Sequence, residues 1–214
     1  MKQPPPPNDW VLNGLFPTPI YNTKRDSNLS SEEEEKEIED IIKEGMQELG
    51  GVSQSINKYI FNDNLKKLKQ FCEQQIKIYV EQVINPKEKI DFYITLSWLN
   101  IIKPGGFHHE HRHPNSILSG VFYISTQKGD SICIIDPNVD MKELITFAPK
   151  EYNIWNSGIT HIPVSPGELI IFPSWLRHMV ELNEIATTDR ISISFNTFAR
   201  GTLGTHKDLT ELIL

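Results

Sequence analysis

The chain has 214 residues, of which 38% are hydrophobic and 23% charged, and its formal net charge is −7. This length allows a buried core, whereas the acidic balance argues against nucleic acid as a partner because phosphate binding needs a basic face. No apolar run reaches the roughly 18 residues of a membrane span, and the N-terminus lacks the hydrophobic segment of a signal peptide. The sequence therefore predicts a globular protein, cytoplasmic by default, that needs neither nucleic acid nor membrane.

The N-terminal part is predicted to be a tail followed by an edge strand. Residues 1–9 contain four consecutive prolines, which favour a flexible and solvated segment. The apolar segment Leu15–Tyr21 follows, and its prolines restrict it to the edge of a sheet. Residues 10–214 are expected to form a single domain, with helical support over about 30–84 and a β core over about 90–200.

Two helices are predicted before residue 85. Serines at 30–31 precede an acidic run, which suits a helix N-terminus, and Gly50-Gly51 is the expected stop of this first helix. The second helix runs from about 62 to 84 and ends before Pro86. Its apolar stripe is Leu65, Leu68, Phe71, Cys72, Ile76, Tyr79, Val80 and Val83. That spacing indicates a helix face packed on a sheet.

After residue 90 the pattern changes to short alternating segments separated by Gly, Pro and Asp turns. The predicted strands are Phe92–Ile102, Ile117–Ser125, Ser131–Ile135, Glu168–Pro173, Met179–Leu182 and Arg190–Phe198. Helices followed by many short strands indicate a mainly β (α+β) fold, a β-sandwich or jelly roll with the N-terminal helices outside it.

The two cysteines, Cys72 and Cys133, have neither metal-ligand spacing nor the spacing of a disulfide framework. We expect both to be buried small apolar residues in a reducing compartment. His161 and His206 are isolated and are expected at the surface.

Four of the seven histidines fall within the segment 108–113, and another, His178, follows the strand that ends at Pro173. In a strand, residues i and i+2 share a face, so His111 and His113 can present two imidazoles to one metal ion. His178 is the expected third ligand, because a jelly roll brings distant strand ends together. Two other registers stay open: His109 with His111, and His108 with Glu110.

The carboxylate register would give two histidines and one acid on one face, which is the ligand set of a non-heme iron(II) site with open positions. Arg190 lies on a strand where Ser192, Ser194 and Asn196 alternate with apolar residues. The polar face is expected to line a wet or charged interior. A guanidinium there can hold a carboxylate through two parallel hydrogen bonds, so the site is expected to bind a small dicarboxylate beside the metal.

Four segments together resemble the 2-oxoglutarate/Fe(II) oxygenases common in marine phages and bacteria, distant relatives of the prolyl 4-hydroxylases. These segments are His111–Ser116, Leu118–Tyr123, Gly167–Trp175 with His178, and Arg190–Asn196. The resemblance covers about residues 95–198. It implies a double-stranded β-helix (jelly-roll) fold, iron(II) as cofactor and 2-oxoglutarate as cosubstrate.

Carried over by position, the resemblance implies a set of site residues. The metal ligands would be His111, His113 and His178; the residues at the cosubstrate would be Arg190, Tyr123, Ser192 and Asn115, with Arg190 as its anchor. The wider superfamily has an acid two residues after the first histidine, and this chain has a histidine there. A three-histidine site carries one more positive charge, which changes the potential of the iron.

The implied activity is that of a dioxygenase, a hydroxylase that couples decarboxylation of 2-oxoglutarate to succinate with hydroxylation of a C–H bond, with ascorbate as reductant in vitro. The substrate expected from this relationship is a protein or peptide side chain, with a free amino acid or a nucleotide-linked small molecule as open alternatives. The expected location is the host cytoplasm if the chain is phage-encoded. The oligomeric state stays open. Two alternatives are a cupin-like metal enzyme that does not use 2-oxoglutarate and a non-catalytic jelly-roll module stabilised by metal.

Overall fold

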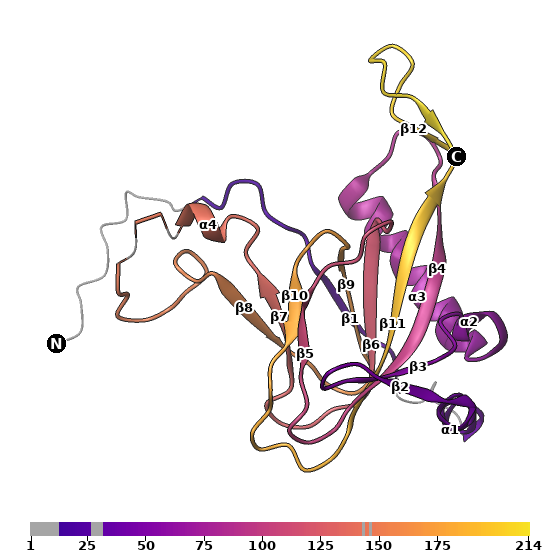
Figure 1. The fold of residues 1–214 in the computed structure, drawn as a ribbon. Coiled ribbons are helices and arrows are strands. Elements are labelled where there is room, and N and C mark those ends of the chain that lie inside the picture. Colours follow the sequence, from indigo (N-terminus) through magenta and orange to yellow (C-terminus); the bar gives the residue numbers. More distant parts are fainter. Residues whose placement is uncertain (1–12, 27–31, 143, 146) are drawn as a thin grey trace.

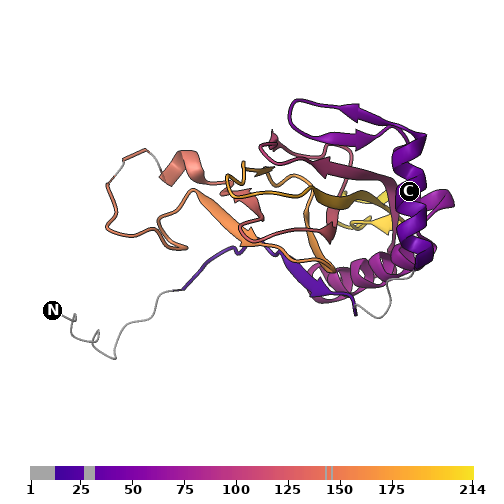
Figure 2. The ribbon, with the colours of Figure 1, turned by 90° about the horizontal axis from the view of Figure 1, so that it is seen from below.

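The computed structural model describes residues 13–26, 32–142, 144–145 and 147–214 (Figure 1). The predicted tail at 1–9 and the serine cap at 30–31 lie outside the described residues. Two antiparallel sheets form the body; the helices that precede residue 85 gather at one side of it, and the short helix that begins at residue 139 lies at the opposite side (Figure 2). Within the described ranges, no helix combines the length and hydrophobicity needed to cross a bilayer.

The larger sheet has seven strands in the order β1-β9-β6-β11-β4-β3-β2. Their bounds are β1 Tyr21–Lys24, β9 Glu168–Pro173, β6 Leu118–Ser125, β11 Arg190–Arg200, β4 Asp91–Ile102, β3 Ser53–Ser55 and β2 Met46–Glu48. All neighbours pair antiparallel, and the pairing of β11 with β4 is the longest. We call this the major sheet.

The smaller sheet, here the minor sheet, has the order β5-β10-β7-β8. Its strands are β5 His108–His111, β10 His178–Val180, β7 Ser131–Ile135 and β8 Ile159–Pro163. A separate two-stranded ribbon joins β12 Thr202–Leu203 to β13 Leu212–Ile213. The predicted jelly roll with helices outside it is confirmed, and the strands predicted at β7 and β9 have the predicted bounds.

The helices are α1 Glu32–Glu44, α2 Ile60–Asp63, α3 Lys66–Tyr79, the π-helical turn η2 Val80–Ile84, and α4 Val139–Lys142. The continuous helix predicted over 62–84 is therefore wrong. Leu65 adopts a left-handed φ of 56° and separates α2 from α3, and the last turn is π-helical. The predicted stripe nevertheless packs on the sheet, except that Val83 is exposed.

Two further predicted boundaries are wrong. The edge strand begins only at Tyr21, because Pro17 and Pro19 have no N–H to donate. The first helix ends before Gly45, which has a φ of 131°, and Gly50-Gly51 instead turns the β2–β3 hairpin. Neither hairpin strand has the alternating apolar residues that would have identified it.

The core has two layers, one on each face of the major sheet. Between the helices and the sheet, residues such as Leu68, Ile193 and Phe195 form an apolar cluster. Between the two sheets, Tyr123, Phe172 and their neighbours form a smaller cluster. Because neighbours on a strand alternate, the polar residues of β11 point between the sheets, which is where the candidate site lies.

Candidate metal centre

Three imidazoles converge between the two sheets. His111 ends β5 and His178 begins β10, and the antiparallel register places these two residues opposite one another. The chain beyond β5 then brings His113 to the same place, with its Nε2 3.3 Å from the Nε2 of His178, 65 residues away in sequence. One ligand atom from each of the three residues lies within 4.8 Å of the others. The pairing of β5 with β10 thus assembles the predicted trio.

Hydrogen bonds to backbone carbonyls orient two of these rings. The Nδ1 of His178 lies 3.0 Å from the carbonyl oxygen of Leu176, and the Nδ1 of His111 lies 2.8 Å from that of His109. A carbonyl only accepts, so each Nδ1 carries the hydrogen and each Nε2 keeps its lone pair. Such a partner on the second ring nitrogen is typical of metal-ligating histidines.

The same burial keeps the imidazoles neutral. Burial, with further effects from the neighbouring histidines, lowers the pKa of His178 to about 3 and that of His113 to about 4. Burial also lowers the pKa of His111. A neutral imidazole is the form that ligates a metal, so no proton has to be displaced near neutral pH.

The register that pairs His108 with Glu110 is not assembled. The carboxylate of Glu110 accepts a hydrogen bond from Arg177 at 2.9 Å, and both side chains are partly exposed. Within the described part of the chain, no carboxylate joins the group of His111, His113 and His178. The donor set on this face therefore consists of imidazoles alone.

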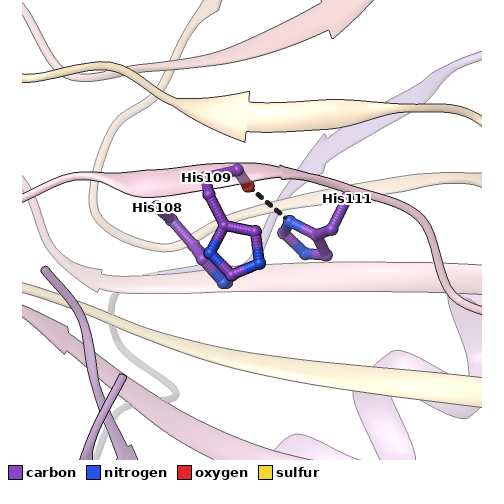
Figure 3. A group of neighbouring side chains, drawn as sticks. All are labelled: His108, His109 and His111. Atoms are coloured by element: carbon purple, nitrogen blue, oxygen red, sulfur yellow. Dashed lines mark hydrogen bonds between the residues drawn. The ribbon is translucent and has the colours of Figure 1, made fainter. Parts of the chain in front are cut away.

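The register of His109 with His111 does form a group, together with His108 (Figure 3). The rings of His108 and His111 have centroids 4.2 Å apart, and His108 lines the same cavity as the trio. His109, however, is exposed, and this group contains no residue from β10. The trio with His178 is more enclosed and links two strands, so we favour it.

The cavity that holds the three histidines is also lined by Arg190 and Tyr123. Arg190 is 5% exposed, donates to the carbonyl of Ser131 at 2.8 Å, and lies 5.2 Å from the Tyr123 ring centroid. Among the described residues, no acid forms an ion pair with Arg190, and the buried Tyr123 hydroxyl has no hydrogen-bond partner. Burial raises the pKa of Tyr123 to about 12, so the hydroxyl is a donor. A carboxylate would satisfy both groups.

Of the two remaining residues predicted at the cosubstrate, one lines the cavity and the other does not. Ser192 is buried and lines the cavity, as do Trp98 and Asn100 on the neighbouring strand β4. Asn115 lies in an exposed turn with a left-handed φ of 57° and is not among the residues that line the cavity, so its expected cosubstrate contact stays a prediction without support from this geometry. Its conformation explains why an asparagine is suitable at this turn.

A serine network that the sequence did not reveal holds the two histidine segments together. The hydroxyl of Ser174 lies 2.7 Å from those of Ser116 and Ser119, and Ser119 donates to Asn196 at 2.8 Å. The amide of His113 donates to the carbonyl of Ser174 at 3.0 Å. In sequence these serines look like ordinary turn residues, because their partners lie 55 or more residues away.

Comparison with known proteins shows which family the core of the chain resembles. Residues 96–196 match the model of the family described as "Putative 2OG-Fe(II) oxygenase". This stretch contains every cavity residue named above. The match spans 101 of the 214 residues and covers the jelly-roll core, so this part of the chain is similar to the 2OG-Fe(II) oxygenases. No curated protein sequence matches the chain.

Several solved structures share the fold. An oxidoreductase of the 2OG-Fe(II) oxygenase family from Burkholderia pseudomallei has 9% identity and a TM-score of 0.55, covering 83% of each chain. A prolyl-4-hydroxylase from Pseudomonas putida has 14% identity and a TM-score of 0.54, covering 84% of this chain and 92% of that one. HygX from Streptomyces hygroscopicus, with nickel and 2-oxoglutarate bound, has 9% identity and a TM-score of 0.55, covering 84% and 82%.

Proposed function

We propose that the protein is a 2-oxoglutarate-dependent hydroxylase in which His111, His113 and His178 hold iron(II) and Arg190 anchors the cosubstrate. One observation carries this proposal: three neutral imidazoles lie in the same cavity as a buried guanidinium that has no acidic ion-pair partner among the described residues. When bound, iron(II) supplies dioxygen activation coupled to decarboxylation of 2-oxoglutarate to succinate.

In this proposal the chain's own residues bind the metal ion and hold its ligands in a fixed orientation. The three histidines offer Nε2 lone pairs whose direction is fixed at two of them by the carbonyls behind the rings. The serine network keeps the His113 turn against the segment that leads to His178. These contacts hold the three histidine side chains in position before the metal binds, so metal binding requires little further ordering of the protein.

Arg190 and Tyr123 are suited to the remote carboxylate of 2-oxoglutarate. The guanidinium offers charge-assisted hydrogen bonds, and the Tyr123 hydroxyl offers a further donor. Ser192 lies on the same face of β11 and can donate as well. Trp98 and Phe172 form apolar walls that exclude water from the site.

The absence of a carboxylate among the described site residues has an electrostatic consequence. A neutral ligand set leaves both positive charges of iron(II) uncompensated by the protein, so the attraction for dianionic 2-oxoglutarate is stronger than with one acidic ligand. We therefore expect metal and cosubstrate to bind with strong mutual reinforcement.

We propose that the substrate is a protein or peptide side chain. We also propose that residues 10–214 form a single domain and that the protein works in a reducing cytoplasm. The fold shared with a prolyl-4-hydroxylase supports a peptide substrate. The loop between β7 and β8 carries exposed apolar residues, including Phe147, Tyr152 and Ile154, which also suit a polypeptide. Two free buried cysteines agree with a reducing compartment.

The test is a succinate assay with purified protein, iron(II), ascorbate and 2-oxoglutarate, with and without a peptide library containing proline. We expect succinate in the complete mixture and none without iron. Turnover that does not require 2-oxoglutarate would point to a cupin-like enzyme. No turnover, together with a large loss of thermal stability on chelation, would point to a metal-stabilised module, and either result would overturn the proposal.

A further inference from the structure

A second group of metal-ligating side chains lies on the opposite face of the minor sheet. Cys133 of β7 is paired with His161 of β8, and Glu181 directly follows β10. On β7, the neighbours of Cys133 point into the core between the sheets, and on β10 His178 and Val180 point into the cavity. Since side chains alternate along a strand, Cys133 and Glu181 point outward, away from the trio.

The three side chains meet over the central strand. A ligand atom of Cys133, one of His161 and one of Glu181 all lie within 4.8 Å of one another. The Nε2 of His161 is 2.9 Å from a carboxylate oxygen of Glu181, and these two side chains are 51% and 49% exposed. Cys133 itself is fully buried beneath them. The imidazole and the carboxylate thus come from the strands on either side and cover the thiol.

We propose that Cys133, His161 and Glu181 form a second cation site, which takes a thiophilic divalent metal of the zinc type. Thiolate, imidazole and carboxylate together are a donor set that zinc accepts in four-coordinate sites. The exposure of His161 and Glu181 leaves access for a water as fourth ligand. Since this group lies on the outer face and the trio on the inner face, the two sites share no ligand.

The hydrogen bond between His161 and Glu181 accounts for the contact of these two side chains, but the Cys133 thiol beneath them takes no part in it. Burial raises the pKa of the Cys133 thiol, so without metal this sulfur is protonated and a poor partner for the carboxylate. A bound zinc ion displaces the thiol proton and offers all three donors one partner.

The site would stabilise the part of the fold that has least other support. It would join β7, β8 and β10, strands of three to five residues whose outer face is not packed by helices in the described core clusters. Since β10 carries His178, a metal here would also hold one ligand of the trio in place. We therefore expect zinc at this site to raise the melting temperature without supplying catalysis.

Cobalt(II) is the probe that separates the two sites. It is titrated into metal-free, full-length protein, and a thiolate-to-cobalt charge-transfer band in the near ultraviolet reports on sulfur ligation. We expect the band in wild type, in Cys72→Ser, which removes the other cysteine, and in His178→Ala, which removes a ligand of the trio. We expect it to vanish in Cys133→Ser. No band in folded wild type, or an undiminished band in Cys133→Ser, would overturn the proposal.

Two milder variants keep the thiol and guard against misfolding. His161→Asn and Glu181→Gln should each weaken cobalt binding at the thiolate site by more than about 100-fold, beyond the usual loss for an outer-shell change. Zinc should raise the melting temperature of His178→Ala, in which the trio is disabled, but not that of the double variant His178→Ala with Cys133→Ser. Unchanged cobalt affinity in both variants would count against the site. Because His178→Ala retains this site, failure of the proposed oxygenase activity would leave these results unaffected.

Discussion

The two faces of the major sheet differ in what they contribute. On β11, Ile193 and Phe195 point toward the helices and are fully buried in the apolar cluster. On the same strand, Arg190, Ser192 and Ser194 point between the sheets and line the cavity. One strand therefore supplies both the packing that stabilises the fold and the polar groups that suit a ligand.

On the face of the major sheet that points toward the minor sheet, most buried polar side chains of the described residues have hydrogen-bond partners, and one does not. Asn100 donates to Ser194 at 2.9 Å, and Ser119 donates to Asn196 at 2.8 Å. By contrast, the buried Tyr123 hydroxyl beside Arg190 lacks a hydrogen-bond partner among the described residues. Because an unmade buried hydrogen bond is costly, the exception marks the place where a ligand is expected. The helix-facing layer should govern stability and the inner layer should govern binding.

The largest effect on binding without a matching effect on stability is expected from His178→Ala. Loss of this ligand should reduce iron(II) affinity and succinate formation by more than about 100-fold, since outer-shell changes alone cost about 10- to 100-fold. The melting temperature of the metal-free protein should change little. His206→Ala is the matched control, because that side chain is 91% exposed and distant in sequence from the trio. Normal turnover in His178→Ala would remove this residue from the site.

On the helix-facing side of the major sheet, Leu68→Ala should lower stability and leave cosubstrate binding unchanged. Leu68 on α3 is 1% exposed within the apolar cluster, and truncating such a residue costs about 2–5 kcal/mol of unfolding free energy. Chemical denaturation measures the loss. At a temperature where the variant is folded, its affinity for 2-oxoglutarate should equal that of wild type. A variant that keeps its stability but loses cosubstrate binding would contradict the division of roles.

Arg190→Ala tests the binding layer within one strand. A charged hydrogen bond contributes about 1.5–3 kcal/mol, so we expect the affinity for 2-oxoglutarate to fall by about 10- to 150-fold while iron binding persists. Calorimetry with the iron-loaded protein measures this change. Arg200→Ala is the control, since Arg200 ends the same strand and stacks on Tyr93 at 4.1 Å, away from the cavity. Equal losses in both variants would show a general effect on β11.

The sequence predicted this division where it depends on local alternation. The pattern of Arg190–Asn196 indicated one apolar and one polar face, and the structure has both. It did not decide among the histidine registers, because that choice depends on how β5 pairs with β10, which lies far along the chain. The cross-strand group at Cys133 was missed for the same reason. The break at Leu65 was missed because left-handed backbone at a leucine has no sequence signal.

Gly120→Ala should destabilise the fold through excess volume instead of a cavity. Gly120 lies opposite Phe195 in the register of β6 and β11, and a Cβ there would collide with the Phe195 ring. Overpacking of this kind costs about 1–3 kcal/mol, so the denaturation midpoint should fall with little change in 2-oxoglutarate affinity of the folded protein. A variant as stable as wild type would show that the helix-facing layer can rearrange around β6.

The smallest effect is expected on the solvent side of the same helix that carries Leu68. Lys77 and Glu81 form an exposed pair at 3.8 Å, with side chains 76% and 56% exposed. Such pairs contribute below about 0.5 kcal/mol and are screened by salt, so Lys77→Ala should leave the unfolding free energy almost unchanged. Chemical denaturation at low and at high salt measures the contribution of this pair to the unfolding free energy and its screening by salt. A loss comparable to that of Leu68→Ala would mean that the outer surface of α3 also supports the fold, because burial alone would then no longer account for the contribution of this helix.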